Sequence, residues 1–177
     1  ISLCLRTIAR YQMDNATLAA RAIEILDRGS SITQEHIQAG IGKAFWAGRM
    51  EEVRADFFVD GAHNEDGVQA FIETVREDGF AGERILLCSV VQDKDYSSMI
   101  RQMAESGLFT KAYVAQMQSY RAIDPTKLVD LWKQHTGQEL QVFESVSKAV
   151  SVLLEERKEG QRIYAAGSLY LVGEIKE

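Results

Sequence analysis

Short apolar runs alternate with amphipathic segments from Phe57 to the end of the chain, and this alternation constrains the fold more than any other feature of the sequence. The runs that we expect to form strands are 57–59, 84–91, 111–115, 140–143 and 162–166. The segments between them carry apolar residues at helical spacing, as at Val68, Phe71, Ile72 and Val75. This alternation predicts an α/β fold with a doubly wound, mostly parallel sheet, helices on both faces and right-handed crossovers.

The chain before this region is predicted to form two helices and a connection. An Ala-rich segment at 15–28 is apolar around much of its circumference, which predicts a helix packed on more than one side. A Gly-Ser-Ser break ends it, and Thr33 caps a second helix. Residues 45–49 lose the helical period and predict a hinge, followed by strand-like alternation at 50–53. The hinge carries Arg49, and the local pattern favours a solvated linker residue there.

The composition argues against several classes of function. A formal net charge of -6, without a basic cluster, argues against an extended nucleic-acid surface. No run approaches the roughly 18 apolar residues that span a bilayer. Cys4 and Cys88 are too far apart in sequence for a metal motif, and the histidines are too few for a His-rich zinc site. We therefore expect a globular protein of the reducing cytoplasm, without metal ligands of its own.

The stretch Phe57–Asn64 is the first candidate for a functional site. Its apolar residues end at Asp60, and His63 and a helix-capping Asn64 follow. Ligands of open α/β sheets bind at the carboxyl ends of strands, which is where Asp60 and His63 fall. The alternative is a well-capped turn without further function, because Asp-Gly is a common turn signal.

Two further predicted strand ends resemble this corner. Lys94 and Ser168 each follow a buried run, and the carboxyl ends of parallel strands lie on one edge, so both can share a rim with Asp60 and His63. The alternatives are a solvated charge for Lys94 and a helix cap for Ser168. Neither G-x-x-x-x-G-K-[ST] nor G-x-G-x-x-G occurs, so this chain has no standard loop for a triphosphate.

Five motifs occur in order along nearly the whole chain. They are Tyr11-Gln12-x-x-Asn15, Trp46-x-Gly48-Arg49, Asp60-Gly61-Ala62-His63-Asn64, Asp93-Lys94-Asp95 and Gly167-Ser168-Leu169-Tyr170-Leu171-Val172-Gly173-Glu174. Together they resemble folylpolyglutamate synthase/dihydrofolate synthase, the folate branch of the Mur ligase family. The resemblance covers only the carboxyl-terminal part of that family, whose larger amino-terminal ATPase domain carries the phosphate loop. Because the chain also begins with Ile1 rather than Met, we expect it to be a piece of a longer protein.

The resemblance implies two parts in this chain. Residues 1–45 would be the last helical segment of the central ATPase domain, and 46–177 the complete Rossmann-like, glutamate-binding carboxyl-terminal domain. The implied reaction is ATP-dependent amide ligation, in which a folate or dihydropteroate carboxylate takes the γ-phosphate and the amino group of L-glutamate attacks the acyl phosphate. Magnesium would be bound mainly by the absent domain. The active site would lie between domains, so the 177 residues alone are expected to be inactive.

The resemblance also implies a role for each candidate residue. Asn15 would contact the adenine of ATP, Arg49 its phosphates and Asp60 its ribose hydroxyls. His63 would lie beside the acyl phosphate and the incoming glutamate, where it either transfers a proton or only positions the reactants.

Lys94 and Ser168 would bind the carboxylates of glutamate, again by resemblance. Two alternatives remain for the whole chain. One is another Mur-type ligase, which joins an amino acid to a cell-wall precursor, and the other is a non-catalytic α/β binding module. The sequence does not distinguish dihydropteroate from reduced folates as the acceptor.

Overall fold

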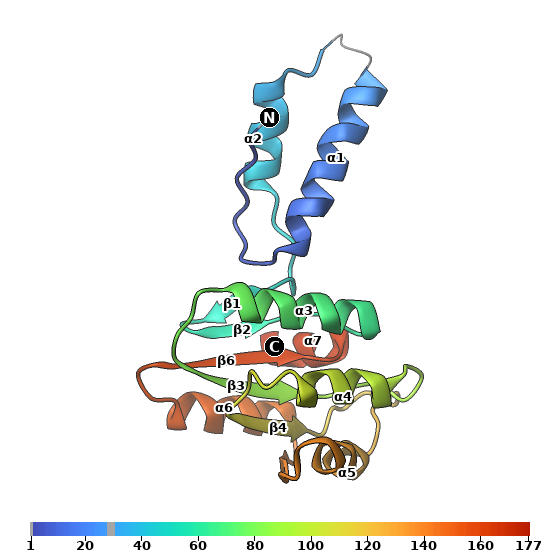
Figure 1. Cartoon of the computed structure of the whole chain (residues 1–177), viewed down its shortest axis with the longest axis vertical. Helices are drawn as coiled ribbons and strands as arrows, with labels where there is room; N and C mark the ends of the chain where they lie inside the picture. Colours follow the sequence, from blue (N-terminus) through green and yellow to red (C-terminus); the bar gives the residue numbers. More distant parts are fainter. Residues whose placement is uncertain (1, 28–30) are drawn as a thin grey trace.

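The computed structural model describes residues 2–27 and 31–177, and it consists of an α/β body with a pair of helices at one end (Figure 1). The expected helix end at Arg28 and the break at Gly29 and Ser30 lie outside the described residues. The elements are α1 (Tyr11–Asp27), α2 (Gln34–Lys43), β1 (Glu51–Arg54), β2 (Phe57–Val59), α3 (Glu65–Glu77), β3 (Glu83–Cys88), α4 (Tyr96–Glu105), β4 (Lys111–Ala115), α5 (Pro125–Thr136), β5 (Gln141–Phe143), α6 (Val146–Glu156), β6 (Gln161–Ala166) and α7 (Leu169–Lys176).

The sheet has six strands in the order β1-β2-β6-β3-β4-β5. β1 is antiparallel to β2, and the other neighbours are parallel. α3, α4 and α5 lead the chain in one direction along the sheet, and α6 leads it back to β6, between β2 and β3. Right-handed crossovers in opposite directions place their helices on opposite faces, so the predicted doubly wound sheet is confirmed.

Each face of the sheet has its own apolar core. Phe58 and Leu86 point to the face covered by α3, α4 and α5, and they belong to the same apolar core as Phe71 of α3. Phe57 and Leu87, one residue along each strand, point to the other face, which α6 and α7 cover. This period of two is the consequence of strand geometry, and it explains why both predicted runs are apolar throughout.

The helix caps predicted at Asn64 and Thr33 are confirmed, and Asp124 caps α5 in the same way. Asn64 accepts a hydrogen bond from the Gly67 amide at 2.8 Å, and Asp124 accepts one from the Thr126 amide at 2.9 Å. Thr33 accepts one from the backbone of α2 at 3.3 Å. Each cap satisfies an amide that has no partner within its own helix.

The third strand ends earlier than the sequence predicts. β3 stops at Cys88 rather than at Val91, because its partners β4 and β6 end at the same level. The Ser89 hydroxyl then donates to the Ala115 carbonyl at 2.5 Å, and Val91 forms an isolated antiparallel bridge with Ala122. The apolar run continues past the strand because these residues stay buried between loops.

α1 is less enclosed than its composition predicts. Its buried residues are Ala16 and Ala20, which pack with α2. Large apolar side chains on α1 remain exposed, namely Met13 (61%), Leu18 (71%), Ile25 (63%) and Leu26 (81%). The prediction of packing on more than one side is therefore wrong for the described part of the chain, because α2 covers a single stripe of the helix.

Candidate functional site

The corner at 60–64 lies at the carboxyl end of β2, as predicted. Its backbone is hydrogen-bonded to Gly48 of the linker at 2.7 Å, to Ala165 of β6 at 2.8 Å and to Gly167 at 3.0 Å. Gly167 has a φ of 115°, and a β-carbon there would lie 2.7 Å from the Ser89 carbonyl oxygen. This glycine therefore allows the ends of β2, β6 and β3 to meet at one rim.

The Asp60 carboxylate joins three segments of the chain. It is 1% exposed. Its Oδ2 accepts hydrogen bonds from the Tyr11 hydroxyl at 2.7 Å and from the Met50 amide at 3.0 Å. Its Oδ1 accepts one from the Ala62 amide at 2.9 Å. A buried carboxylate needs such donors, and here they tie α1 and the linker to the corner.

The electrostatics of this junction keep Tyr11 as a donor. Burial raises the pKa of the Asp60 carboxyl, and its hydrogen bonds and the charge of Arg49 offset part of that rise. Burial also raises the pKa of the Tyr11 hydroxyl, and the Asp60 charge raises it further. Arg49 lines the same cavity as this pair, and its positive charge lowers both pKa values.

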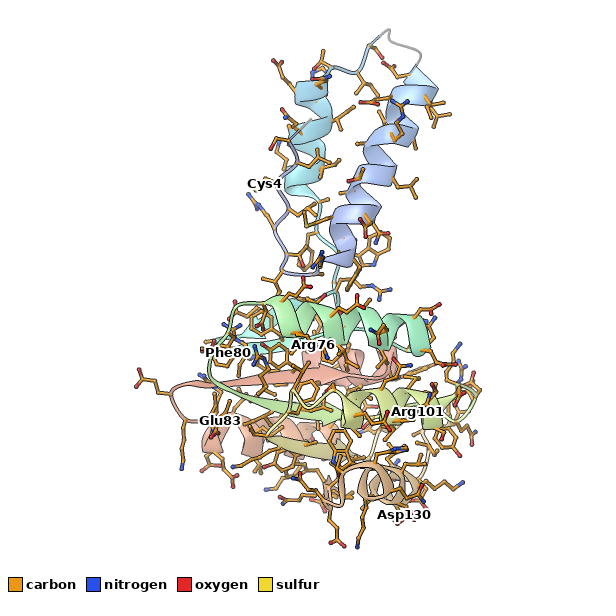
Figure 2. The ribbon with its side chains drawn as sticks, viewed as in Figure 1. Cys4, Arg76, Phe80, Glu83, Arg101 and Asp130 are labelled. Atoms are coloured by element: carbon orange, nitrogen blue, oxygen red, sulfur yellow. The ribbon has the colours of Figure 1, made fainter. Side chains whose placement is uncertain are left out.

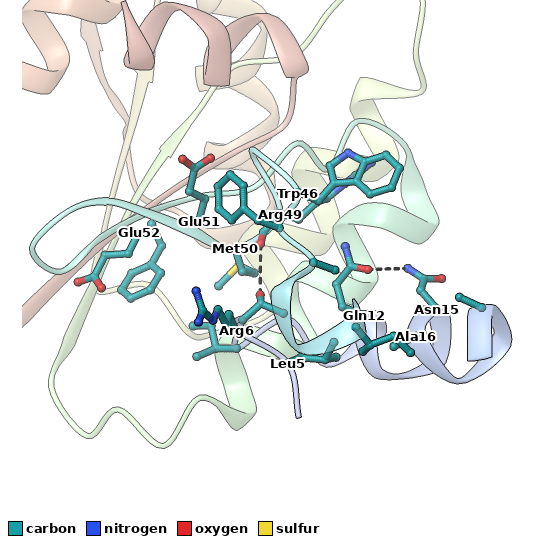
Figure 3. A pocket seen from close by; sticks show the side chains of 17 residues that line it. Leu5, Arg6, Gln12, Asn15, Ala16, Trp46, Arg49, Met50, Glu51 and Glu52 are labelled. Atoms are coloured by element: carbon teal, nitrogen blue, oxygen red, sulfur yellow. Dashed lines mark hydrogen bonds between the residues drawn. The ribbon is translucent and has the colours of Figure 1, made fainter. Parts of the chain in front are cut away.

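Two cavities flank the junction, with volumes of about 520 Å³ and about 700 Å³. The smaller is lined by Tyr11 and Asp60 and by the first turns of α3, and the larger extends toward β1 (Figure 3). The residues that line both are Gln12, Asn15, Trp46 and Arg49. These volumes suit a small-molecule ligand, which would meet a cation, an amide and an aromatic ring.

The structure thus brings together three predicted residues from different elements. Asn15 comes from α1, Arg49 from the linker and Asp60 from the corner, and all three line the smaller cavity. Asn15 is exposed and its amide donates to Gln12 Oε1 at 3.0 Å. Arg49 is half-buried and lines both cavities, so it is more enclosed than its local sequence pattern indicates.

His63 is half-buried on the corner, and its ring is held by the backbone. Nδ1 lies 2.8 Å from the Gly61 carbonyl oxygen. A carbonyl oxygen only accepts hydrogen bonds, so Nδ1 carries the proton and Nε2 of the neutral ring keeps its lone pair. His63 does not line either of the two cavities formed by the described residues at the junction.

Ser168 and Lys94 lie at the carboxyl ends of β6 and β3. Ser168 is 1% exposed and caps α7, where its hydroxyl oxygen accepts a hydrogen bond from the Tyr170 amide at 3.1 Å. Lys94 is exposed in the turn before α4, and its backbone amide donates to Val91 at 3.4 Å. Ser168 therefore has the cap role that the sequence allowed, and a substrate role for either residue stays a prediction.

Sequence reasoning missed the contribution of Tyr11 and Trp46. Both belong to the motifs quoted above, but neither was given a role, and nothing in the spacing shows that Tyr11 meets Asp60. Among residues 2–27 and 31–177, no group of three or more His, Cys, Asp and Glu side chains is placed to hold a metal ion. No helix of the same described ranges is long and apolar enough to cross a membrane.

Residues 48–169 match the Mur ligase glutamate ligase domain. The chain belongs to the Mur ligase family. The matched region contains every predicted site residue except Asn15, and it begins at the linker between the helix pair and the α/β body of this Mur ligase chain.

Proteins with similar sequences belong to the folate branch of the Mur ligases. The chain is 28% identical over 175 residues to the dihydrofolate synthase/folylpolyglutamate synthase of Bacillus subtilis, an alignment that covers 96% of the chain and 39% of that protein. It is 24% identical over 178 residues to the probable dihydrofolate synthetase of Schizosaccharomyces pombe, covering 93% of the chain and 42% of that protein. The predicted resemblance is confirmed, and this chain spans about two fifths of the length of these relatives.

Solved structures share the fold. Folylpolyglutamate synthase from Mycobacterium tuberculosis, complexed with ADP, superposes with a TM-score of 0.85 at 23% identity and covers 97% of this chain and 40% of that chain. A bifunctional folylpolyglutamate synthase/dihydrofolate synthase with Mn, AMPPNP and L-glutamate bound has a TM-score of 0.72 at 18% identity and covers 83% of this chain and 35% of that chain. The Rossmann-like α/β fold of this Mur ligase chain is therefore confirmed.

Proposed function

We propose that this chain is part of an ATP-dependent ligase that joins L-glutamate to a folate or dihydropteroate carboxylate. The observation that carries the proposal is the cavity where Asn15, Arg49 and Asp60 meet, because these residues come from three separate elements. Membership of the Mur ligase family and the names of the folate-branch relatives support the same activity.

The two parts of the chain would belong to two domains of the longer enzyme. We assign residues 1–45 to the end of the central ATPase domain and 46–177 to the carboxyl-terminal domain. The family match that begins at residue 48 supports this boundary. The large apolar side chains exposed on α1 support it as well, since several of them on one helix are typical of a face that another part of a protein covers.

The junction has groups that suit the parts of a nucleotide. Arg49 offers a permanent, planar cation for phosphate oxygens, and Asn15 offers an amide with both a donor and an acceptor for a base. The Trp46 side chain is 73% exposed beside them and offers a stacking surface. Asp60 suits ribose hydroxyls as an acceptor, although its oxygens already hold three donors.

The amide-forming step would take place at the same rim. Transfer of the γ-phosphate to the acceptor carboxylate makes a reactive acyl phosphate, and attack by the amino group of glutamate then forms the amide and releases phosphate. His63 keeps Nε2 free, which suits either acceptance of a proton or positioning of the incoming amine. Lys94 and Ser168 are assigned to the carboxylates of glutamate, and magnesium mainly to the amino-terminal domain.

Incorporation of labelled glutamate tests the proposal. The longer enzyme that contains this chain should add glutamate to dihydropteroate or tetrahydrofolate only with ATP, and Arg49→Ala should lower kcat/KM for ATP by about a hundredfold, the loss expected for a charge-assisted phosphate contact. The 177 residues alone should be inactive. Activity of the chain alone would contradict the two-domain assignment, and activity with muramyl precursors instead of folates would favour the cell-wall branch.

A further inference from the structure

The three donors to Asp60 belong to different parts of the molecule. The amides of Met50 and Ala62 are backbone groups of the linker end and of the corner itself, so they stay in place while the α/β body is folded. The Tyr11 hydroxyl is a side-chain group from α1, on the other side of the junction. Only this one of the three donors can leave by a side-chain movement.

The acceptor capacity of Asp60 is almost fully used. An ionised carboxylate offers about four lone-pair positions, and three of them are occupied. The residue is 1% exposed, so a ligand in the cavity of about 520 Å³ reaches its oxygens only where another group makes room. Tyr11 lines the same cavity, which makes its hydroxyl the group that stands between Asp60 and a ligand.

We propose that the Tyr11 hydroxyl competes with a ribose hydroxyl of the bound nucleotide for the Asp60 carboxylate. This inference rests on the nucleotide site proposed above. Tyr11 is then a specificity-determining residue, because a ribonucleotide exchanges one hydrogen bond to Asp60 for another. A nucleotide that lacks ribose hydroxyls leaves the Tyr11 hydrogen bond intact, and it binds without making that exchange.

Other contacts keep α1 in place when the Tyr11 side chain leaves. Ala9 is 1% exposed within the core on the α3 face of the sheet. The Thr7 hydroxyl donates to the Arg49 carbonyl at 3.3 Å, and Arg10 pairs with Glu77 of α3. The exchange at Asp60 therefore does not require the helix pair to separate from the α/β body.

The test compares Tyr11→Phe with wild type, both made in the longer enzyme that contains this chain, in binding ADP and 2′,3′-dideoxyadenosine diphosphate, followed by calorimetry or NMR. Loss of the competing hydroxyl should tighten ADP by about tenfold, the factor that corresponds to one hydrogen bond. The affinity for the dideoxy analogue should stay the same. Tyr11→Leu, which removes the ring as well, should show the same tighter binding of ADP with unchanged binding of the dideoxy analogue. It is a second variant for the case in which Tyr11→Phe fails to fold.

Two controls separate this effect from others. Tyr120→Phe removes a hydroxyl from a residue that is 88% exposed in a loop, and it should change neither affinity. Adding Asp60→Asn to Tyr11→Phe should abolish the gain for ADP, because the gain acts through that carboxylate. A Tyr11→Phe chain that binds ADP equally or more weakly overturns the competition while the nucleotide site stands. Absence of ADP binding at millimolar concentrations in both chains overturns the nucleotide site, and the competition with it.

Discussion

Asp78 follows α3 and comes two residues before Phe80, which Figure 2 labels, and its side chain is fully shielded from solvent. It accepts hydrogen bonds from the Tyr164 hydroxyl and, at 3.0 Å, from the Arg84 guanidinium, with Arg162 at 3.4 Å. Replacing Asp78 by Asn would leave the partly buried guanidinium groups of Arg84 and Arg162 with a weaker partner. We expect Asp78→Asn to lower the free energy of unfolding by about 3 kcal/mol at neutral pH, measured by urea denaturation.

The Asp78 carboxylate should also make the free energy of unfolding depend on pH in the acid range. Burial alone would raise the pKa of Asp78, but hydrogen bonds from Tyr164, Phe80 and Arg84 outweigh it, so the pKa lies below its ordinary value. A carboxylate whose pKa is lowered by folding contributes its full stabilisation at pH values above its unfolded-state pKa, which is near 3.9. That contribution is lost as the pH falls through the folded-state pKa. The gap between wild type and Asp78→Asn should therefore shrink below about pH 4. An equal gap at all pH values would contradict this account, and Asp93→Asn, at an exposed pair, is the control.

Residues of the candidate site differ in how far the sequence predicts them. Asp60 and His63 follow directly from their position after an apolar run and before a cap. Asn15 and Arg49 were assigned through the family resemblance, because their local patterns indicate only a helix and a linker. The Tyr11 contact to Asp60 joins residues 49 apart, and such a pairing depends on how α1 lies on the body.

The start of α3 fixes the corner at the element scale. Asn64 caps this helix through the Gly67 amide, and a β-carbon at Gly67 would lie 2.9 Å from the Asn64 side-chain oxygen. We expect Asn64→Ala to lower the free energy of unfolding by about 1 kcal/mol, with Asn64→Asp close to wild type, since Asp is an equally good cap. Thermal or urea unfolding measures both. Gln69→Ala, exposed on the same helix, should change stability by less than about 0.5 kcal/mol, and a larger loss there than at Asn64 would contradict the cap argument.

Most elements of the α/β body follow from the sequence, because amphipathic helices and apolar strands each have a distinct period. The bounds of β4 agree with the predicted run at every residue. β3 differs because burial between loops, as at Val91, leaves the same apolar signal as burial in a strand. The burial of α1 differs from the prediction because the composition of a helix shows which faces are apolar but not what covers them.

The apolar core is distributed unevenly between the helix pair and the α/β body. The helix pair is held by a cluster whose buried members are Ala16, Ala20, Ile37 and Ile41. The α/β body has a much larger core on each face of its sheet. Burial of apolar surface is the main favourable contribution to folding, so the two parts should open with different free energies.

Native-state hydrogen exchange measures this difference directly. Amides of α1 and α2 should exchange at least about tenfold faster than those of β3 and β6, because local opening of the pair exposes far less apolar surface than unfolding of the sheet. Removing the Tyr11 hydrogen bond, in Tyr11→Phe, should speed exchange at the start of α1 and leave β6 unchanged, since that bond ties α1 to Asp60. Equal protection across the chain would mean that the helix pair and the α/β body unfold as one cooperative unit, so that binding at the junction could not move one part without the other.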